Sequence, residues 1–130
     1  MAIKNNPVGW FEIYVNDMDR AVSFYQSVLD TKLEALPTPA ETDEGLKMVA
    51  FPMDTTSTGA GGALVKMEGF GAGGNSTIVY FTSEDCAIEE ARIAAAGGKV
   101  HRSKMDIGEY GFIVLALDTE GNMFGLHSMK

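Results

Sequence analysis

The sequence predicts an α+β fold in which two βαβββ modules form an open, curved, eight-stranded mixed sheet around a cleft, with the helices outside. Three observations lead to this prediction: one order of elements occurs twice, each copy has a single amphipathic helix, and each copy has four short apolar strands. One helix covers only one face of a four-stranded sheet, so the other face has to curve around a cleft. The 130 residues suit a single domain, built of modules at about 8–68 and 76–130.

The first module opens with a short apolar strand at 10–15, which leads into an acidic turn and a helix. Asp17 is placed to cap the helix, because its side-chain oxygen can accept a free amide of the first turn. Apolar residues then recur at three- and four-residue spacing and form one stripe: Ala21, Val22, Tyr25, Val28 and Leu29. Three further strands are predicted, at 32–36, 46–51 and 63–67. A loop rich in glycine and threonine, at 54–62, precedes the last of them.

The second module follows a second glycine-rich loop, at 69–75, and repeats this order. A strand at 77–81 leads to Ser83, the expected N-cap of the second helix. The expected buried stripe of that helix is Ala87, Ile88, Ala91, Ala94 and Ala95. Gly97-Gly98 ends the helix, because glycine accepts the left-handed conformation of a helix stop. Strands at 99–102, 112–117 and 123–127 complete the module, and residues 118–122 form the turn of the final hairpin.

Composition excludes several classes of partner. The net charge of −8 disfavours nucleic acid and anionic membrane surfaces, whose phosphates would repel the protein. The sequence has no run of about 18 apolar residues, so no membrane-spanning helix is predicted. Residues 1–7 lack the apolar stretch of a signal peptide. Cys86 is the only cysteine, so an internal disulfide is excluded, and we expect a cytoplasmic protein.

Three segments of the chain match one known protein family in order and spacing. Residues 12–25 read Glu-Ile-Tyr-Val-Asn-Asp-Met-Asp-Arg-Ala-Val-Ser-Phe-Tyr, residues 84–100 contain an acidic turn, a helix and Ala-Gly-Gly-Lys-Val, and residues 118–122 read Asp-Thr-Glu-Gly-Asn. They resemble the glyoxalase/bleomycin resistance/extradiol dioxygenase superfamily, with Thr119 in place of a proline in its Asp-Pro-x-Gly-Asn hairpin. The resemblance implies the vicinal oxygen chelate fold, and it is strongest to the branch of predicted enzymes related to lactoylglutathione lyase. It does not imply one activity, because this fold hosts isomerases, dioxygenases, epimerases, lyases and drug-sequestering proteins.

The resemblance also implies four metal-ligand positions, which are mostly His or Glu in the metal-using members. In this sequence they fall on Trp10, Lys66, Ile78 (within one residue) and Gly125. None of these side chains is a suitable ligand for a divalent ion, so we expect a cleft without a metal and without a cofactor.

A metal site elsewhere is the competing hypothesis. The chain has only two histidines, His101 and His127, and no histidine or cysteine spacing typical of a metal motif. A site made only of carboxylates, from Glu12, Glu44 or Asp54, stays open.

Strand alternation predicts the side chains that face the cleft. They are Trp10, Glu12, Tyr14, Leu64, Lys66, Glu68, Ile78, Tyr80, Thr82, Met123, Gly125 and His127. Glu12 and His127 are the candidate catalytic residues, because burial beside Lys66 would tune either one as a general base. The candidate substrate-binding residues are Trp10, Tyr14, Lys66, Tyr80 and Tyr110, the last on a glycine-flanked loop over the cleft. The alternative is a structural Glu12–Lys66 salt bridge.

Three functional hypotheses follow. The first is a metal-free cleft that binds a small organic molecule, with lyase or isomerase chemistry by proton transfer as an open addition. The second is a protein that sequesters a drug or metabolite, resembling the bleomycin-resistance members, for which a cationic ligand would suit the net charge. The third is a metal-dependent glyoxalase or dioxygenase with atypical ligands. In each case we expect a homodimer, because an open sheet has edges that need covering.

Overall fold

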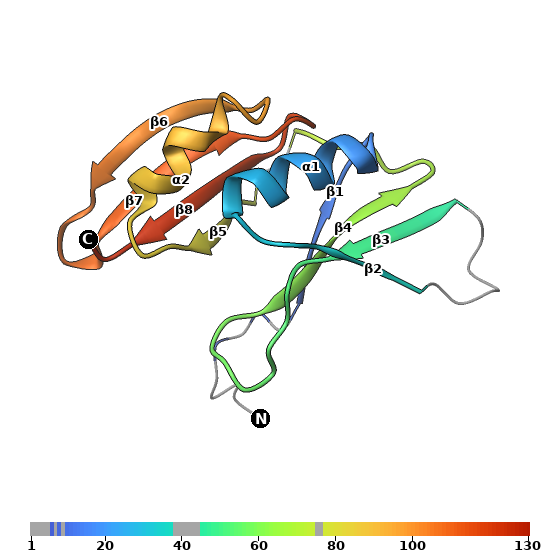
Figure 1. Cartoon of the computed structure of the whole chain (residues 1–130), viewed down its shortest axis with the longest axis horizontal. Coiled ribbons are helices and arrows are strands. Elements are labelled where there is room, and N and C mark those ends of the chain that lie inside the picture. The colour runs from blue at the N-terminus through green and yellow to red at the C-terminus, as the bar shows by residue number, and fades with distance from the viewer. Residues whose placement is uncertain (1–5, 7, 9, 38–44, 75–76) are drawn as a thin grey trace.

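The computed structural model describes residues 6, 8, 10–37, 45–74 and 77–130 (Figure 1). Residues 1–5 and 7, on which the signal-peptide prediction mainly rests, lie outside the described residues, as do Glu44 and Asn75. Among the described residues, no helix has the length and apolar character needed to cross a membrane.

The first module has the predicted βαβββ order. Its elements are β1 (Trp10–Tyr14), α1 (Met18–Leu29), β2 (Glu34–Leu36), β3 (Leu46–Ala50) and β4 (Gly61–Met67). The strands form a sheet in the order β1-β4-β3-β2, in which β1 runs parallel to β4 and the other pairs are antiparallel.

The second module repeats this topology. Its elements are β5 (Val79–Thr82), α2 (Cys86–Ile93), β6 (Lys99–Asp106), the 3₁₀ helix η1 (Gly108–Tyr110), β7 (Phe112–Leu117) and β8 (Met123–Ser128). The sheet order β5-β8-β7-β6 matches that of the first sheet, again with one parallel pair at the edge. The α+β fold of two βαβββ modules is therefore confirmed. The structure adds that the eight strands form two four-stranded sheets and do not join in one continuous hydrogen-bonded sheet.

An aromatic core joins the two modules. The ring of Tyr25 on α1 lies 5.6 Å from Phe51 after β3, 5.8 Å from Phe81 on β5 and 5.5 Å from Phe124 on β8, measured between centroids. Phe24, next to Tyr25, packs edge-on against Phe124. Both sheets therefore turn their helix-facing sides toward one shared core beneath α1, which lies beside α2 (Figure 1). We call the opposite sides of the first and second sheets the first and second outer faces.

The two helices agree unequally with the sequence prediction. Asp17 caps α1 as expected and accepts the amide of Arg20, and the predicted α1 stripe is buried or half-buried. On α2 the cap is Asp85, which accepts the amide of Ala87, so the prediction of Ser83 is corrected. The predicted alanine stripe of α2 is also wrong: Ala87, Ile88, Ala91, Ala94 and Ala95 are exposed, and the helix buries Cys86 and Ile93 instead.

The turn between β7 and β8 fastens the second module to the first. Glu120, whose side chain is fully buried, accepts hydrogen bonds from the amides of Asn16 and Asp17 and forms an ion pair with Arg20. These bonds lower the pKa of Glu120 to about 2, although its burial opposes the shift. Asp118 accepts a hydrogen bond of 2.6 Å from the Tyr25 hydroxyl. We call this turn, residues 118–122, the clamp.

Candidate functional site

The register of the parallel pair β1–β4 decides which side chains share the first outer face. Trp10 is paired with Gly61, Glu12 with Ala63, and Tyr14 with Val65. Residues in register on neighbouring strands point to the same side of a sheet, so these six form one surface. Met48 and Ala50 of β3 extend it, because they are paired with Val65 and Ala63.

The same register corrects the predicted face of β4. Leu64 is fully buried in the shared core, beside its partner Ile13. Lys66 has the same parity as Leu64 and therefore lies on the helix side of the sheet, opposite Lys47 of β3. The structure thus places Lys66 on the other side of the sheet from Glu12, and the expected Glu12–Lys66 salt bridge is absent from the described residues.

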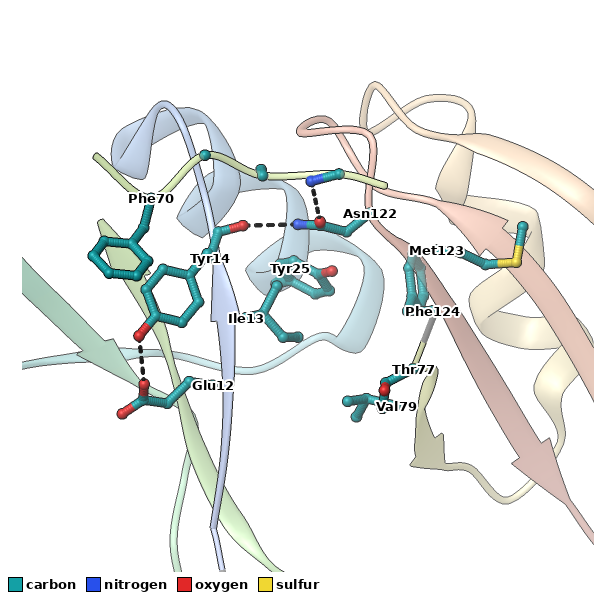
Figure 2. Close-up of a pocket in the computed structure, with 13 residues that line it drawn as sticks. Glu12, Ile13, Tyr14, Tyr25, Phe70, Thr77, Val79, Asn122, Met123 and Phe124 are labelled. Atoms are coloured by element: carbon teal, nitrogen blue, oxygen red, sulfur yellow. Dashed lines mark hydrogen bonds between the residues drawn. The ribbon is translucent and has the colours of Figure 1, made fainter. Parts of the chain in front are cut away.

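A cleft of about 310 Å³ opens in the gap between β1 and the second sheet, as Figure 2 shows. Its floor is apolar and consists mainly of core residues reached through the gap: Ile13, Tyr25, Val79 and Phe124. One wall carries Glu12, Tyr14 and Phe70, and the linker between the modules contributes 71–73. Asn122 of the clamp holds the upper rim, since it donates to the carbonyl of Tyr14 (2.9 Å) and accepts from the amide of Gly73 (2.8 Å).

Glu12 is held in place by two neutral donors. The indole Nε1 of Trp10 donates to its Oε2 at 3.2 Å, and the hydroxyl of Tyr14 donates to its Oε1 at 3.0 Å. The hydrogen bond to Glu12 raises the pKa of Tyr14, so this hydroxyl stays a donor at neutral pH. Phe70 packs beside Tyr14, with 5.9 Å between the ring centroids. The surroundings of Glu12 therefore combine one carboxylate with three aromatic side chains, those of Trp10, Tyr14 and Phe70.

The second outer face carries the other predicted site residues. Tyr80 of β5 is paired with Gly125 of β8, and Thr82 is paired with His127. The Nε2 atom of His127 is hydrogen-bonded to the carbonyl of Tyr110, at 2.6 Å, and the Tyr110 side chain is exposed. The imidazole therefore anchors η1 to β8.

The structure brings together only part of the predicted site. Glu12 and Tyr14 line the cleft and Trp10 is bonded to Glu12, whereas Tyr80, Tyr110 and His127 are not among the lining residues. In Figure 2, Glu12 and Tyr14 extend to one side of β1, and Met123 extends to the far side of β8. The two outer faces of one chain thus point away from each other.

Sequence reasoning missed several residues of both faces. Phe70 and Asn122 lie outside the strands, so alternation could not place them, although Asn122 belongs to the Asp-Thr-Glu-Gly-Asn motif. Arg102 and Met105 of β6 share the second outer face through their pairing with Leu115 and Ile113, and β6 extends beyond the predicted strand end. Residues 103–106 read Ser-Lys-Met-Asp, which has no apolar alternation, so no sequence signal marked this extension.

The comparisons with known proteins agree with this architecture. A family model described as the Glyoxalase/Bleomycin resistance protein/Dioxygenase superfamily matches residues 8–126. The chain belongs to this superfamily. No curated protein sequence matches the chain.

Several solved structures share the fold at low identity. TnmS3, an antibiotic binding protein from Streptomyces sp. CB03234, is 18% identical with a TM-score of 0.68, over 99% of this chain and all of that one. Glyoxalase I from Zea mays is 23% identical with a TM-score of 0.68, over 92% of this chain but 43% of its own length. A glyoxalase/bleomycin resistance protein from Albidiferax ferrireducens T118 is 19% identical with a TM-score of 0.63, over 96% of this chain and all of that one. At these identities the likeness shows the fold alone.

The residues present do not fit the metal site that the superfamily implies. Gly61, not Lys66, lies beside Trp10 on the first outer face, and neither Gly61 nor Trp10 offers a ligand. On the second outer face a β-carbon at Gly125 would overlap the Tyr80 ring, so Tyr80 fills the space that a ligand side chain would need. In the part of the chain that the structure describes, no three His, Cys, Asp or Glu side chains are grouped to hold a metal.

The carboxylate alternative has no geometric support either. Asp54 accepts hydrogen bonds from Thr56 and Ser57, which lower its pKa, and it is not among the residues that line the cleft with Glu12. Glu44 lies outside the described residues.

Proposed function

We propose that the protein binds a small organic molecule, without a metal ion, in the cleft between β1 and the second sheet. The observation that carries the proposal is the cleft itself: an apolar floor with one fixed carboxylate and aromatic side chains on one wall. Small-molecule sites have this composition, because apolar contacts supply affinity and a few placed polar groups fix orientation. The antibiotic binding neighbour TnmS3 shows that the fold serves such a role elsewhere.

We further propose that the protein acts as a homodimer in which the first outer face of one subunit meets the second outer face of the other. The large side chains left exposed support this pairing: Trp10 is 41% exposed on one face, and Tyr80 is 45% exposed on the other. Aromatic side chains such as these are enriched at protein interfaces relative to the rest of the surface. A dimer would enclose the cleft, which one chain leaves open, and we expect it in the cytoplasm, where the buried thiol of Cys86 stays reduced.

Proton transfer by Glu12 or His127, in lyase or isomerase chemistry, is the second candidate. It is favoured by the position of Glu12 on the cleft wall, with oxygen lone pairs left to accept a proton from a ligand. His127 would take part only if its bond to the carbonyl of Tyr110 opened. Sequestration needs neither step.

A thermal-shift screen tests the binding proposal. Neutral, anionic and cationic organic molecules are added to the wild type, to Phe70→Ala and to Ile88→Ala. Phe70 is 58% exposed on the cleft wall, and Ile88 is 50% exposed on α2, so both variants should fold. Ligands of the cleft should raise the melting temperature of the wild type and of Ile88→Ala, but much less that of Phe70→Ala.

The proposal fails if no compound stabilises the wild type, or if every hit stabilises Phe70→Ala equally.

Product analysis of each hit then separates turnover from sequestration. A His127→Ala variant with full turnover would exclude His127 from the chemistry. Size-exclusion chromatography with light scattering measures the molar mass of the protein in solution and so tests for the dimer. A monomer at working concentration would contradict the proposed pairing of the outer faces.

A further inference from the structure

Among the described residues, the lining of the cleft has a single formal charge. Glu12 supplies it, and the other lining residues are apolar, glycine or neutral polar side chains. Glu12 is in neither of the ion pairs found among the described residues, which are Arg20–Glu120 and Lys104–Asp85. A negative charge beside apolar walls attracts cations, and the net charge of −8 adds to that attraction over longer distances.

Glu12 also has unused hydrogen-bonding capacity. A carboxylate has about four lone-pair sites, and the donors on Glu12 are Trp10 Nε1 and the Tyr14 hydroxyl. Both donors are neutral, so they fix the orientation of the carboxylate without cancelling its charge. The remaining lone pairs are available to a donor on a ligand.

Aromatic rings surround this carboxylate. The rings of Tyr14 and Phe70 lie 5.9 Å apart at an angle of 37°, and the indole of Trp10, two residues before Glu12 on β1, is hydrogen-bonded to it. A cation is attracted to the face of an aromatic ring, and more strongly when it is partly desolvated. Carboxylate and rings thus favour the same ligand charge.

We propose that the ligand of this cleft is an amphiphilic organic cation. Its ammonium or other onium group lies against Glu12 among Trp10, Tyr14 and Phe70, and its apolar part lies on the floor formed by Ile13 and Phe124. The inference rests on the proposed function, because it names the ligand class of the same cleft.

The single tryptophan provides the test. Trp10 is the only Trp of the chain, so its indole N–H gives one side-chain cross-peak in a proton–nitrogen NMR spectrum, and that N–H donates to Glu12. The titrants are benzylammonium, benzyl alcohol and benzoate, which share a benzyl or phenyl group and differ in charge, and the cation carries N–H donors for Glu12. The proteins are the wild type, Glu12→Gln, and the matched control Glu84→Gln, which removes an exposed carboxylate outside the cleft.

The cation should shift the indole cross-peak saturably, with a dissociation constant at least 10-fold lower than those of the alcohol and benzoate. Glu12→Gln should weaken cation binding about 10-fold, and Glu84→Gln should change it less than 2-fold. Equal binding of the three compounds, or equal affinity in Glu12→Gln, would overturn the charge assignment while leaving a binding cleft. Absence of any shift with the cation would also overturn it, and the thermal-shift screen decides independently whether the cleft binds other molecules.

Discussion

The two modules have the same topology, but their helices bury different side chains in the core. α1 places Phe24 and Tyr25, both at most 1% exposed, in the core between the sheets, whereas α2 buries Cys86 and Ile93 and leaves its alanines in solvent. The order of elements therefore sets the topology, and the large side chains set where the core lies. α1 therefore supplies the large ring that reaches both sheets, whereas α2 packs on β6, β7 and β8 of the second sheet with smaller side chains.

The largest expected effect tests this unequal division. Phe24→Ala removes a fully buried ring and should lower the free energy of unfolding by about 3–5 kcal/mol. Ile88→Ala, at an exposed position of α2, should change it by less than about 0.5 kcal/mol. Urea denaturation of both variants gives the comparison, and similar losses would mean that α2 contributes to the core as much as α1.

The clamp gives the next largest effect, because it couples the modules through a buried charge. The pKa of Glu120 is about 2 in the folded protein against an ordinary 4.5, so its ionised form stabilises the fold. That stability is fully present above about pH 5 and is lost as the pH falls through 4.5 toward 2. The shift corresponds to about 3 kcal/mol.

Glu120→Gln should therefore be destabilised by about 2–3 kcal/mol at pH 7, and its difference from the wild type should shrink toward pH 2. Chemical denaturation at a series of pH values measures this difference. The exposed Glu84→Gln serves as the control and should show no such trend. A constant gap between Glu120→Gln and the wild type would rule out ionisation of Glu120 as the source.

Sequence alone predicted the parts of the fold that local physics determines. The strand Phe112–Leu117 and the cap Asp17 are found where they were expected, because alternation and capping act within a few residues. The face of β4 was wrong because Gly62, Ala63, Leu64 and Val65 are all buried, so this strand has no polar–apolar alternation to read. The α2 stripe was wrong because alanine favours a helix whether it faces the core or the solvent.

The candidate site was less predictable than the fold. Alternation along one strand is enough to place Trp10, Glu12 and Tyr14 on one face, and their mutual hydrogen bonds follow from that spacing. Phe70 reaches the site through the linker, and the rim depends on Asn122 from the end of the chain. The separation of His127 from Glu12 depends on the packing of two sheets around α1, which no local pattern encodes.

The helix caps provide a smaller test of the comparison between modules. Asp17→Ala and Asp85→Ala each remove a side-chain acceptor for a first-turn amide, which costs about 1 kcal/mol. Asp85→Ala should cost a few tenths more, because the half-exposed ion pair with Lys104 is lost as well. Thermal unfolding with Glu84→Ala as the control measures both losses. If Asp85→Ala left the melting temperature unchanged, Asp85 would not be the N-cap of α2, and Ser83 would again be the candidate.

The smallest expected effect addresses the outward face of α2 directly. Ala91→Gln places a polar side chain at an exposed helix position, so it should change the free energy of unfolding by less than about 0.5 kcal/mol. Ala21→Gln, the matched substitution on α1, places the same side chain at a fully buried position and should be strongly destabilising. Urea denaturation at low protein concentration compares the two variants. A large loss in Ala91→Gln would mean that the alanine face of α2 is covered in solution, and the difference between the modules would then lie in what covers each helix.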